Sequence, residues 1–159
     1  MILWRIVKDK HAVTAFDGEG ARRFGGRWNS LGTAMVYGSA TLSLAALEIL
    51  VHLEVMDFGS RRVAIRVDVP AGIPLPVVTL DQLPLDWRDT PAPHELANWG
   101  DDWIRRGDSL LLAVPSAIVP QECNILINPR HDDFAQLRLQ SPERFVLDPR
   151  LLKQCELRA

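Results

Sequence analysis

The strongest structural signal in this chain of 159 residues lies in residues 42–54, which are rich in Ala and Leu and contain neither Gly nor Pro. This composition predicts an α-helix, and Thr41 or Ser39 can cap its N-terminus. Nearly every face of the predicted helix is apolar, which is typical of a buried helix. We therefore expect it to pack inside the core of a globular domain.

Glu48 interrupts this apolar helix, since its neighbours from Leu44 to Val51 are all Ala, Leu, Ile or Val. Burial of a carboxylate is costly unless a cation, hydrogen-bond donors or an open pocket compensates for the lost hydration. One explanation is therefore a polar pocket that contains Glu48. The alternative is a thin solvent-exposed edge of the helix, marked by Glu48 and by His52 four residues later.

The remaining pattern predicts several short strands and one further helix. Residues 62–69 alternate with period two, which indicates a half-buried strand. Residues 95–106 carry Leu96, Trp99 and Trp103 at helical spacing, so we expect a helix with its tryptophans in the core. Further strands are predicted at residues 2–7, 35–37, 110–114, 124–127 and 144–147.

Two segments lack a regular pattern. Residues 8–26 are polar and Gly-rich, which predicts a mobile loop, and residues 70–93 are Pro-rich, which predicts an irregular or edge-like segment. Strands of mixed spacing around few helices indicate an α+β fold with a mixed β-sheet core. We expect a single domain over residues 1–159, with a core from about residue 2 to 148 and a polar C-terminal tail over residues 149–159.

Charge and hydropathy exclude several functional classes. The chain has 18 Lys and Arg against 20 Asp and Glu and no local basic stripe, so we expect no direct binding of nucleic acid. No run reaches the roughly 18 apolar residues of a membrane span, and the N-terminus does not resemble a signal peptide. Cys123 and Cys155 form no metal or disulfide motif. These features predict a cytoplasmic protein without a metal site.

Two arginines are candidate ligand-binding residues. Arg27 follows two glycines and precedes Trp28, which places a guanidinium and an aromatic face beside a flexible loop. A guanidinium suits bidentate binding of phosphate, although a plain surface arginine explains Arg27 equally well. Arg5 lies inside the apolar run of residues 2–7, so its side chain faces either solvent or a polar cavity.

Tyr37 and Ser116 complete the set of candidates. The Tyr37 ring can share a pocket with Glu48, although a structural tyrosine with its hydroxyl bonded to backbone is the alternative. Ser116 follows the strand predicted at residues 110–114, where a hydroxyl would emerge at the sheet edge. The chain has no G-x-S-x-G, H-E-x-x-H, G-x-G-x-x-G or Walker motif, which argues against serine hydrolase, zinc protease, Rossmann and P-loop mechanisms.

Together these pieces resemble the RES domain, a family named for Arg, Glu and Ser and found in toxins of bacterial toxin–antitoxin pairs. The resemblance extends from the first strand to about Leu147, and its motifs occur in the family's order. They are Trp4-Arg5-Ile6, Gly25-Gly26-Arg27-Trp28-Asn29, Val36-Tyr37, Ser43 to Glu48, Val114-Pro115-Ser116 and Asn124 to His131. The resemblance implies a fold related to the ADP-ribosyltransferase catalytic domain and the breakdown of NAD.

The resemblance also implies roles for the candidate residues. Arg27, Glu48 and Ser116 match the three residues that name the family and are expected to be catalytic, while Arg5 and Tyr37 match further pocket residues. On this basis Arg5 and Arg27 neutralise the diphosphate of NAD, and Tyr37 stacks on its nicotinamide. Ser116 orients the ribose or the carboxamide. Glu48 stabilises the oxocarbenium ion that forms as nicotinamide leaves, or holds a ribose hydroxyl.

The activity implied is that of a type II toxin that cleaves the nicotinamide–ribose bond of NAD with water or phosphate, depletes NAD and arrests growth. NAD is then the substrate, and no cofactor is expected. The partner implied is a cognate antitoxin that covers the active site within a hetero-oligomeric complex. Two alternatives stay open, namely an ADP-ribosyltransferase acting on a specific protein and a non-catalytic nucleotide-binding or interaction module.

Overall fold

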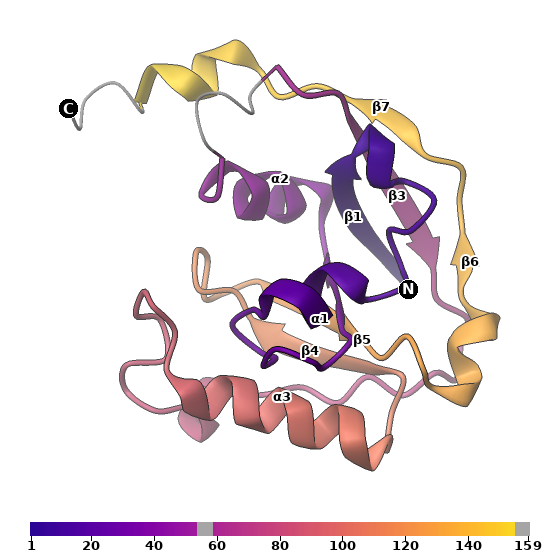
Figure 1. Cartoon of the computed structure of the whole chain (residues 1–159), viewed down its shortest axis with the longest axis vertical. Helices are drawn as coiled ribbons and strands as arrows, with labels where there is room; N and C mark the ends of the chain where they lie inside the picture. The colour runs from indigo at the N-terminus through magenta and orange to yellow at the C-terminus, as the bar shows by residue number, and fades with distance from the viewer. Residues whose placement is uncertain (54–58, 155–159) are drawn as a thin grey trace.

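The computed structural model describes residues 1–53 and 59–154 and contains one curled antiparallel sheet of seven strands (Figure 1). Its strands run in the order β4-β5-β2-β1-β3-β6, and β7 also pairs with β3. They are β1 (Ile2–Lys8), β2 (Val36–Ser39), β3 (Arg62–Asp68), β4 (Leu111–Pro115), β5 (Cys123–Ile127), β6 (Arg138–Leu139) and β7 (Glu143–Phe145). The predicted strands are therefore confirmed, with small shifts at their ends and an additional short strand, β6.

Three α-helices occur among the described residues, namely α1 (Glu19–Phe24), α2 (Leu42–Leu50) and α3 (His94–Arg106). Figure 1 shows α3 running alongside β4 and β5, and α2 beside β1. Short 3-10 helices are η1 (Asp9–His11), η3 (Leu80–Gln82), η4 (Asp132–Gln136) and η5 (Pro149–Gln154). The α+β fold predicted from the pattern of elements is confirmed.

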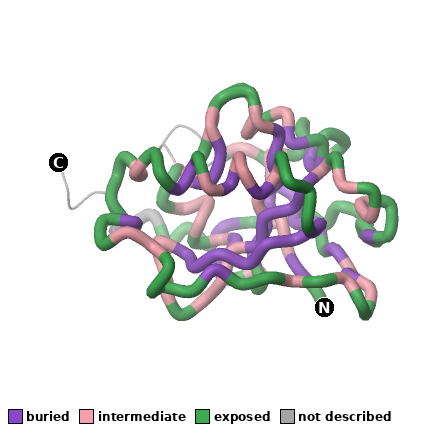
Figure 2. The backbone as a smooth tube through the Cα atoms, turned by 90° about the horizontal axis from the view of Figure 1, so that it is seen from below, coloured by how far each residue is buried: buried purple, intermediate pink, exposed green. Residues whose placement is uncertain are grey.

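The core has two sides, because alternate side chains of the strands point to opposite faces of the sheet. One face, with Leu3, Val36 and Ile125, is covered by connecting segments that contribute Phe16 and Leu137. The other face carries two separate clusters. One packs β4 and β5 against α3, and the other packs β1 and β3 against α2. Figure 2 shows the buried residues gathered in the middle of the molecule and the exposed ones on its outer loops.

The sheet consists of two halves with a narrow connection. β1 pairs with β3 over seven residue pairs, and β2 pairs with β5 over four. Between β1 and β2 the register contains a single pair, Trp4 opposite Ser39. The two halves therefore meet at Ser39.

Helix α2 begins where the sequence predicts, because the Thr41 hydroxyl accepts a hydrogen bond from the backbone N–H of Leu44 at 3.1 Å. The prediction that the helix is buried on nearly every face is wrong. Only Leu44 and Ala45 are fully buried, whereas Leu47 and Val51 are 36% and 58% exposed. The helix lies on the β1 and β3 half of the sheet with one face only, which leaves its opposite face to solvent. The helix ends at Leu50, earlier than predicted, and the predicted end at Glu54 lies outside the described residues.

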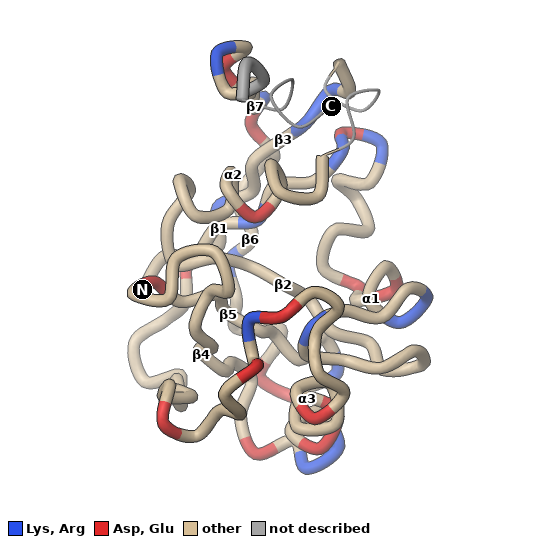
Figure 3. Tube along the Cα trace, turned by 90° about the vertical axis from the view of Figure 1, so that its left-hand side faces the viewer, with Lys and Arg blue, Asp and Glu red and all other residues tan. Residues whose placement is uncertain are grey.

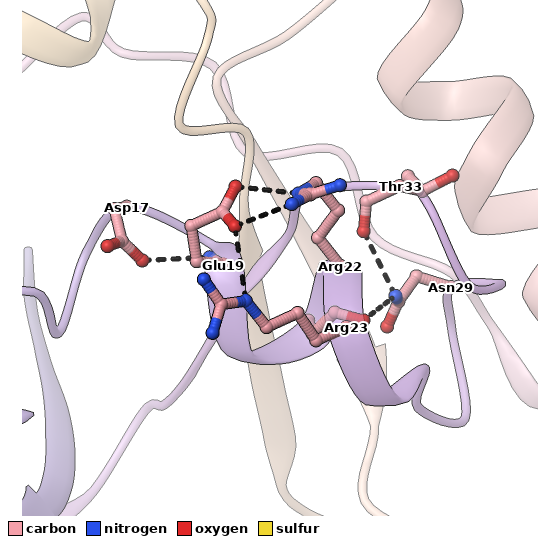
Figure 4. Close-up of polar contacts among 7 residues, drawn as sticks. Asp17, Glu19, Arg22, Arg23, Asn29 and Thr33 are labelled. Carbon is pink, nitrogen blue, oxygen red and sulfur yellow. Dashed lines mark hydrogen bonds and ion pairs between the residues drawn. The ribbon is translucent and has the colours of Figure 1, made fainter.

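The mobile loop predicted for residues 8–26 is also wrong, because this segment contains η1 and α1. The Asp17 carboxylate accepts a hydrogen bond from the backbone N–H of Glu19 at 2.8 Å at the start of α1. Glu19 then pairs with Arg22 at 2.7 Å in an i,i+3 arrangement (Figure 4). The glycines of this segment favour a loop in the sequence-based prediction, so the short charged helix α1 is not predicted.

The second half of the chain follows the predictions more closely. Helix α3 ends at Gly107, whose φ of 64° is the left-handed conformation that glycine favours. Leu96 and Trp103 are buried as predicted, whereas Trp99 is only partly buried. The Pro-rich segment is edge-like, since Val78 donates a backbone hydrogen bond to Ala113 of β4 at 2.8 Å. Cys155 and the rest of the predicted tail beyond residue 154 lie outside the described residues.

The contact between α3 and the segment that contains Trp28 gives a stability prediction. A β-carbon at Gly100 would lie 1.8 Å from the backbone oxygen of Trp28, so Gly100→Ala should force the helix away and lower the free energy of unfolding by at least about 2 kcal/mol. Gly20→Ala in α1 is the matched control, because a β-carbon there meets nothing within 4 Å. It should raise the free energy of unfolding by about 0.5–1 kcal/mol. Urea unfolding measures both, and equal effects would contradict this packing.

Candidate active site

The carboxylate of Glu48 is held by side chains at β4 and β5, which lie in the other half of the sheet from the one on which α2 packs. The Ser116 hydroxyl, just after β4, donates to Glu48 Oε1 at 2.8 Å, and Asn124 Nδ2 of β5 donates to the same oxygen. Within the described chain, Glu48 Oε2 accepts no hydrogen bond. Glu48 is partly buried and is the only charge on α2, visible as the single acidic stretch of that helix in Figure 3. The solvent-edge alternative therefore applies to His52, which is exposed, and not to Glu48.

Ser116 has no exposed surface and has used its hydrogen-bonding capacity. Its hydroxyl donates to Glu48 and accepts from the backbone N–H groups of Ile118 and Val119, each at 3.1 Å. A hydroxyl has one donor and two acceptor sites. In this structure Ser116 therefore positions Glu48, and the direct contact with a substrate expected from the sequence stays a prediction.

Arg27 lies in the segment between α1 and β2 and is partly buried, which argues against a plain surface arginine. Its guanidinium donates to the backbone oxygens of Trp87 and Asp89, the latter at 3.1 Å. Burial lowers the pKa of Arg27, and the charge of Glu48 has the largest opposing effect. The structure therefore places Arg27 within electrostatic reach of the Glu48 carboxylate.

The Tyr37 hydroxyl fixes the segment that carries Arg27. It donates to Asn29 Oδ1 at 2.7 Å and accepts from the backbone N–H of Trp28 at 3.1 Å. Burial raises the pKa of the Tyr37 phenol well above its usual value, which keeps the donor proton in place. A β-carbon at Gly26 would lie 2.7 Å from this hydroxyl, so the close approach requires glycine. The hydroxyl thus has the structural role left open above, and the stacking role of the ring stays a prediction.

Asn29 completes this segment from the other side. Its Nδ2 donates to three backbone oxygens within 3.1 Å, and the bond to Thr33 is drawn in Figure 4. These acceptors belong to Ala21, Ser30 and Thr33. A buried asparagine with every polar atom satisfied holds the backbone on either side of Arg27 in one conformation.

Arg5 of β1 connects the two halves of the sheet through a hydrogen bond to β2. Along β1 it faces the side opposite to Trp4, whose partner across the strands is Ser39, and its guanidinium donates to the backbone oxygen of Tyr37. Burial lowers the pKa of Arg5 to about 10, and the nearby Asp17 carboxylate partly opposes this shift. Its Nε is buried and has no hydrogen-bond partner in the part of the chain that the structure describes. The polar-cavity alternative therefore fits Arg5 better than the solvent alternative.

Asn124 and Ser39 are site residues that the sequence-based prediction missed. Ser39 donates to Asn124 Oδ1 at 2.7 Å, which connects β2 to the residue that holds Glu48. Asn124 begins one of the motifs that carry the family resemblance, and beyond that the sequence shows only a polar residue beside the apolar run from Ile125 to Ile127. That signal carries little information without the register of the sheet.

Two surface hollows lie away from these residues. One of about 530 Å³ is lined by residues of β3 and β7, and one of about 350 Å³ lies between α3 and residues 32–34. Neither contains Glu48, Arg27 or Ser116 in its lining. Among the described residues, no helix has the length and apolar character needed to cross a bilayer.

Comparison with known proteins gives consistent matches over nearly the whole chain. A family model described as RES domain matches residues 2–148. A "Prs ADP-ribosylating toxin" of Sphingobium sp. (strain YBL2) is 36% identical over 155 residues, covering 95% of this chain and 96% of the relative. A "Toxin Res" of Yersinia enterocolitica serotype O:8 / biotype 1B is 37% identical over 152 residues, covering 95% and 99%.

A solved toxin–antitoxin structure shares this fold. It is the crystal structure of the M. tuberculosis MbcT–MbcA toxin–antitoxin complex, with a TM-score of 0.76 over 96% of this chain and 87% of that chain. Sequence identity is 19%, so this likeness shows the shared fold alone.

The role of the Tyr37 hydroxyl can be tested without a substrate. Tyr37→Phe leaves the Trp28 amide and Asn29 Oδ1 without this partner and should lower the free energy of unfolding by about 1–3 kcal/mol. Hydrogen exchange of the Trp28 amide should accelerate as well. Ser109→Ala is the matched control, since Ser109 is a buried hydroxyl that bonds Trp103 and Leu111. It should destabilise the fold without selective acceleration at Trp28, and equal acceleration in both variants would refute the assignment.

Proposed function

This chain belongs to the RES domain family, and from that membership and the geometry around Glu48 we propose that it is a toxin enzyme that cleaves the nicotinamide–ribose bond of NAD. The observation that carries the proposal is a partly buried carboxylate on an otherwise apolar helix, bound through one oxygen and close enough to Arg27 to act on its charge. A chain seldom retains such a carboxylate for stability alone, because its desolvation is costly.

The chemistry of NAD suits this arrangement. When the bond between the anomeric carbon and nicotinamide breaks, the electron pair leaves with the nicotinamide nitrogen, and positive charge develops on the ribose. A carboxylate in a partly desolvated site stabilises that charge better than one in bulk water. Glu48 Oε2, which accepts no hydrogen bond within the described chain, is the atom we assign to the ribose. Water or phosphate then forms the new bond at the anomeric carbon, and the proton of the attacking group is released.

The two arginines support binding of an anionic substrate. The guanidinium of Arg27 is oriented by two backbone oxygens, so its charge is held in place before a ligand binds. In Arg5, the buried Nε without a partner among the described residues is the kind of unsatisfied donor that a bound anion can explain. We assign both to the diphosphate of NAD.

The enzyme activity can be tested directly with purified protein and NAD, with and without phosphate. We expect the wild type to release nicotinamide, and Glu48→Gln to lower kcat/KM by about 10²-fold or more because the developing charge loses its counter-charge. Glu143→Gln on β7, an exposed carboxylate, is the matched control and should behave like the wild type. Full activity in folded Glu48→Gln protein would rule out this role and favour the non-catalytic binding module.

Transfer of ADP-ribose to a protein is the second candidate, favoured by the name of the Sphingobium relative, an ADP-ribosylating toxin. It shares the bond cleavage and differs only in the acceptor at the anomeric carbon. NAD labelled in its adenine moiety, incubated with the protein and a cell lysate, separates the two candidates. For hydrolysis or phosphorolysis we expect all label in small molecules, whereas label on one protein band that Glu48→Gln abolishes would establish the transferase.

We also propose that an antitoxin covers this site. The MbcT–MbcA structure is described as a toxin–antitoxin complex, which supports such a partner by analogy. Apolar side chains are exposed on α2 and just after it, at Leu47 and Val51, and near Arg27 in the sequence, at Phe24 and Leu31. A contiguous exposed apolar patch is typical of a surface that binds another protein, and we assign these side chains to the surface that the antitoxin covers.

A further inference from the structure

We propose that Asn124, oriented by Ser39, is a positioning residue that holds the Glu48 carboxylate in the one orientation that presents Oε2 to the substrate. The proposal rests on the enzymatic function proposed above and adds two residues to its machinery. We refer to Ser39, Asn124 and Ser116, the three side chains that bind Glu48 directly or through one another, as the Glu48 clamp.

The chemistry of the groups determines the direction of each hydrogen bond in the clamp. An ionised carboxylate only accepts, so Asn124 must turn its Nδ2 toward Glu48 and its Oδ1 toward Ser39. Oδ1 only accepts, so the Ser39 hydroxyl must donate. Ser39 is 4% exposed, which leaves little access for a water molecule that could replace it. The Ser39 hydroxyl therefore selects the amide orientation that Glu48 needs.

The sheet holds these residues rigidly. Asn124 lies opposite Ser39 of β2 on one side and opposite Val114 of β4 on the other, so ladders on both sides fix its backbone. Ser39 is also the residue that pairs with Trp4 of β1, where the two halves of the sheet meet. The clamp therefore begins at the junction of the halves and ends at Glu48.

The clamp acts on one oxygen of the carboxylate. Two donors meet Oε1, and each forms a charge-assisted hydrogen bond, which is stronger than a bond between neutral groups. If Asn124 is lost, Ser116 alone cannot prevent rotation of the carboxylate about its terminal bond. Misplacement of a reacting group by about 1 Å can lower a rate by about 10²-fold. Because Asn124 is assigned no contact with the substrate, its loss should affect kcat much more than KM.

The test measures kcat and KM for NAD in the full-length protein. Asn124→Ala should lower kcat by about 10- to 100-fold and change KM by less than about threefold. Asn124→Asp keeps the shape of the side chain but opposes Glu48 with a like charge, so its kcat should fall at least as far. Ser39→Ala should cost about 3- to 10-fold in kcat, the range for one lost neutral hydrogen bond.

The double variant Ser39→Ala/Asn124→Ala tests the order of action. If Ser39 acts on Glu48 only through Asn124, the double variant should have the same kcat as Asn124→Ala alone, whereas independent structural damage would multiply the two effects. Asn128→Ala is the matched control, since Asn128 is 3% exposed and lies roughly 13 Å further along the same strand direction. It should affect stability but not kcat.

The kinetic test distinguishes failure of this positioning proposal from failure of the proposed function. A wild-type protein that neither releases nicotinamide nor transfers ADP-ribose would overturn both. A wild type that turns over NAD, together with an unchanged kcat in Asn124→Ala or in the isosteric Asn124→Asp, would overturn the positioning role alone. Multiplicative losses in the double variant would also overturn it, because Ser39 would then act independently of Asn124.

Discussion

A carboxylate on an apolar helix needs hydrogen-bond donors or a positive charge nearby. Most of this structure contributes to the site because it positions those groups. Ser116 and Asn124 donate to Glu48 from the ends of two strands, and Arg27 contributes a positive charge from a separate segment. Each partner is in turn held by groups that do not approach Glu48. The free energy lost by removing the carboxylate from water is thereby offset by donors that the sheet has already placed.

The segment around Arg27 shows how such placement is achieved without regular structure. Tyr37 and Asn29 satisfy the backbone on both sides of the arginine, and Gly26 allows their close approach. Gly100 of α3 lets the helix backbone touch Trp28. The packing of α3 against the sheet thus helps to orient Arg27, which belongs to neither element. The site therefore depends on the whole domain.

Local signals explain the successful predictions. The cap at Thr41 and the strand β3 depend on neighbours within a few residues, and both are confirmed. The half-buried character predicted for β3 is wrong for its first four residues, because Ala64 on the second face is buried against α2. The errors arise where distant contacts or competing local signals decide. Helix α2 is apolar on nearly every side, yet the sheet covers one of its faces only. Helix α1 forms in a Gly-rich segment, where the Asp17 carboxylate bonds its first turn and Glu19 pairs with Arg22. Hydrophobic periodicity does not report how much of an apolar surface another element covers.

The sequence by itself determined the family resemblance, the α+β class, the main strands and helices, and the residue types at Arg27, Glu48 and Ser116, because these depend on composition and local spacing. Only the tertiary structure decided which atoms meet. Asn124 lies 76 residues from Glu48 and 85 from Ser39, and Ser116 lies 68 from Glu48. Such pairs form only when the register of β2, β4 and β5 is set, and register results from the packing of the whole sheet.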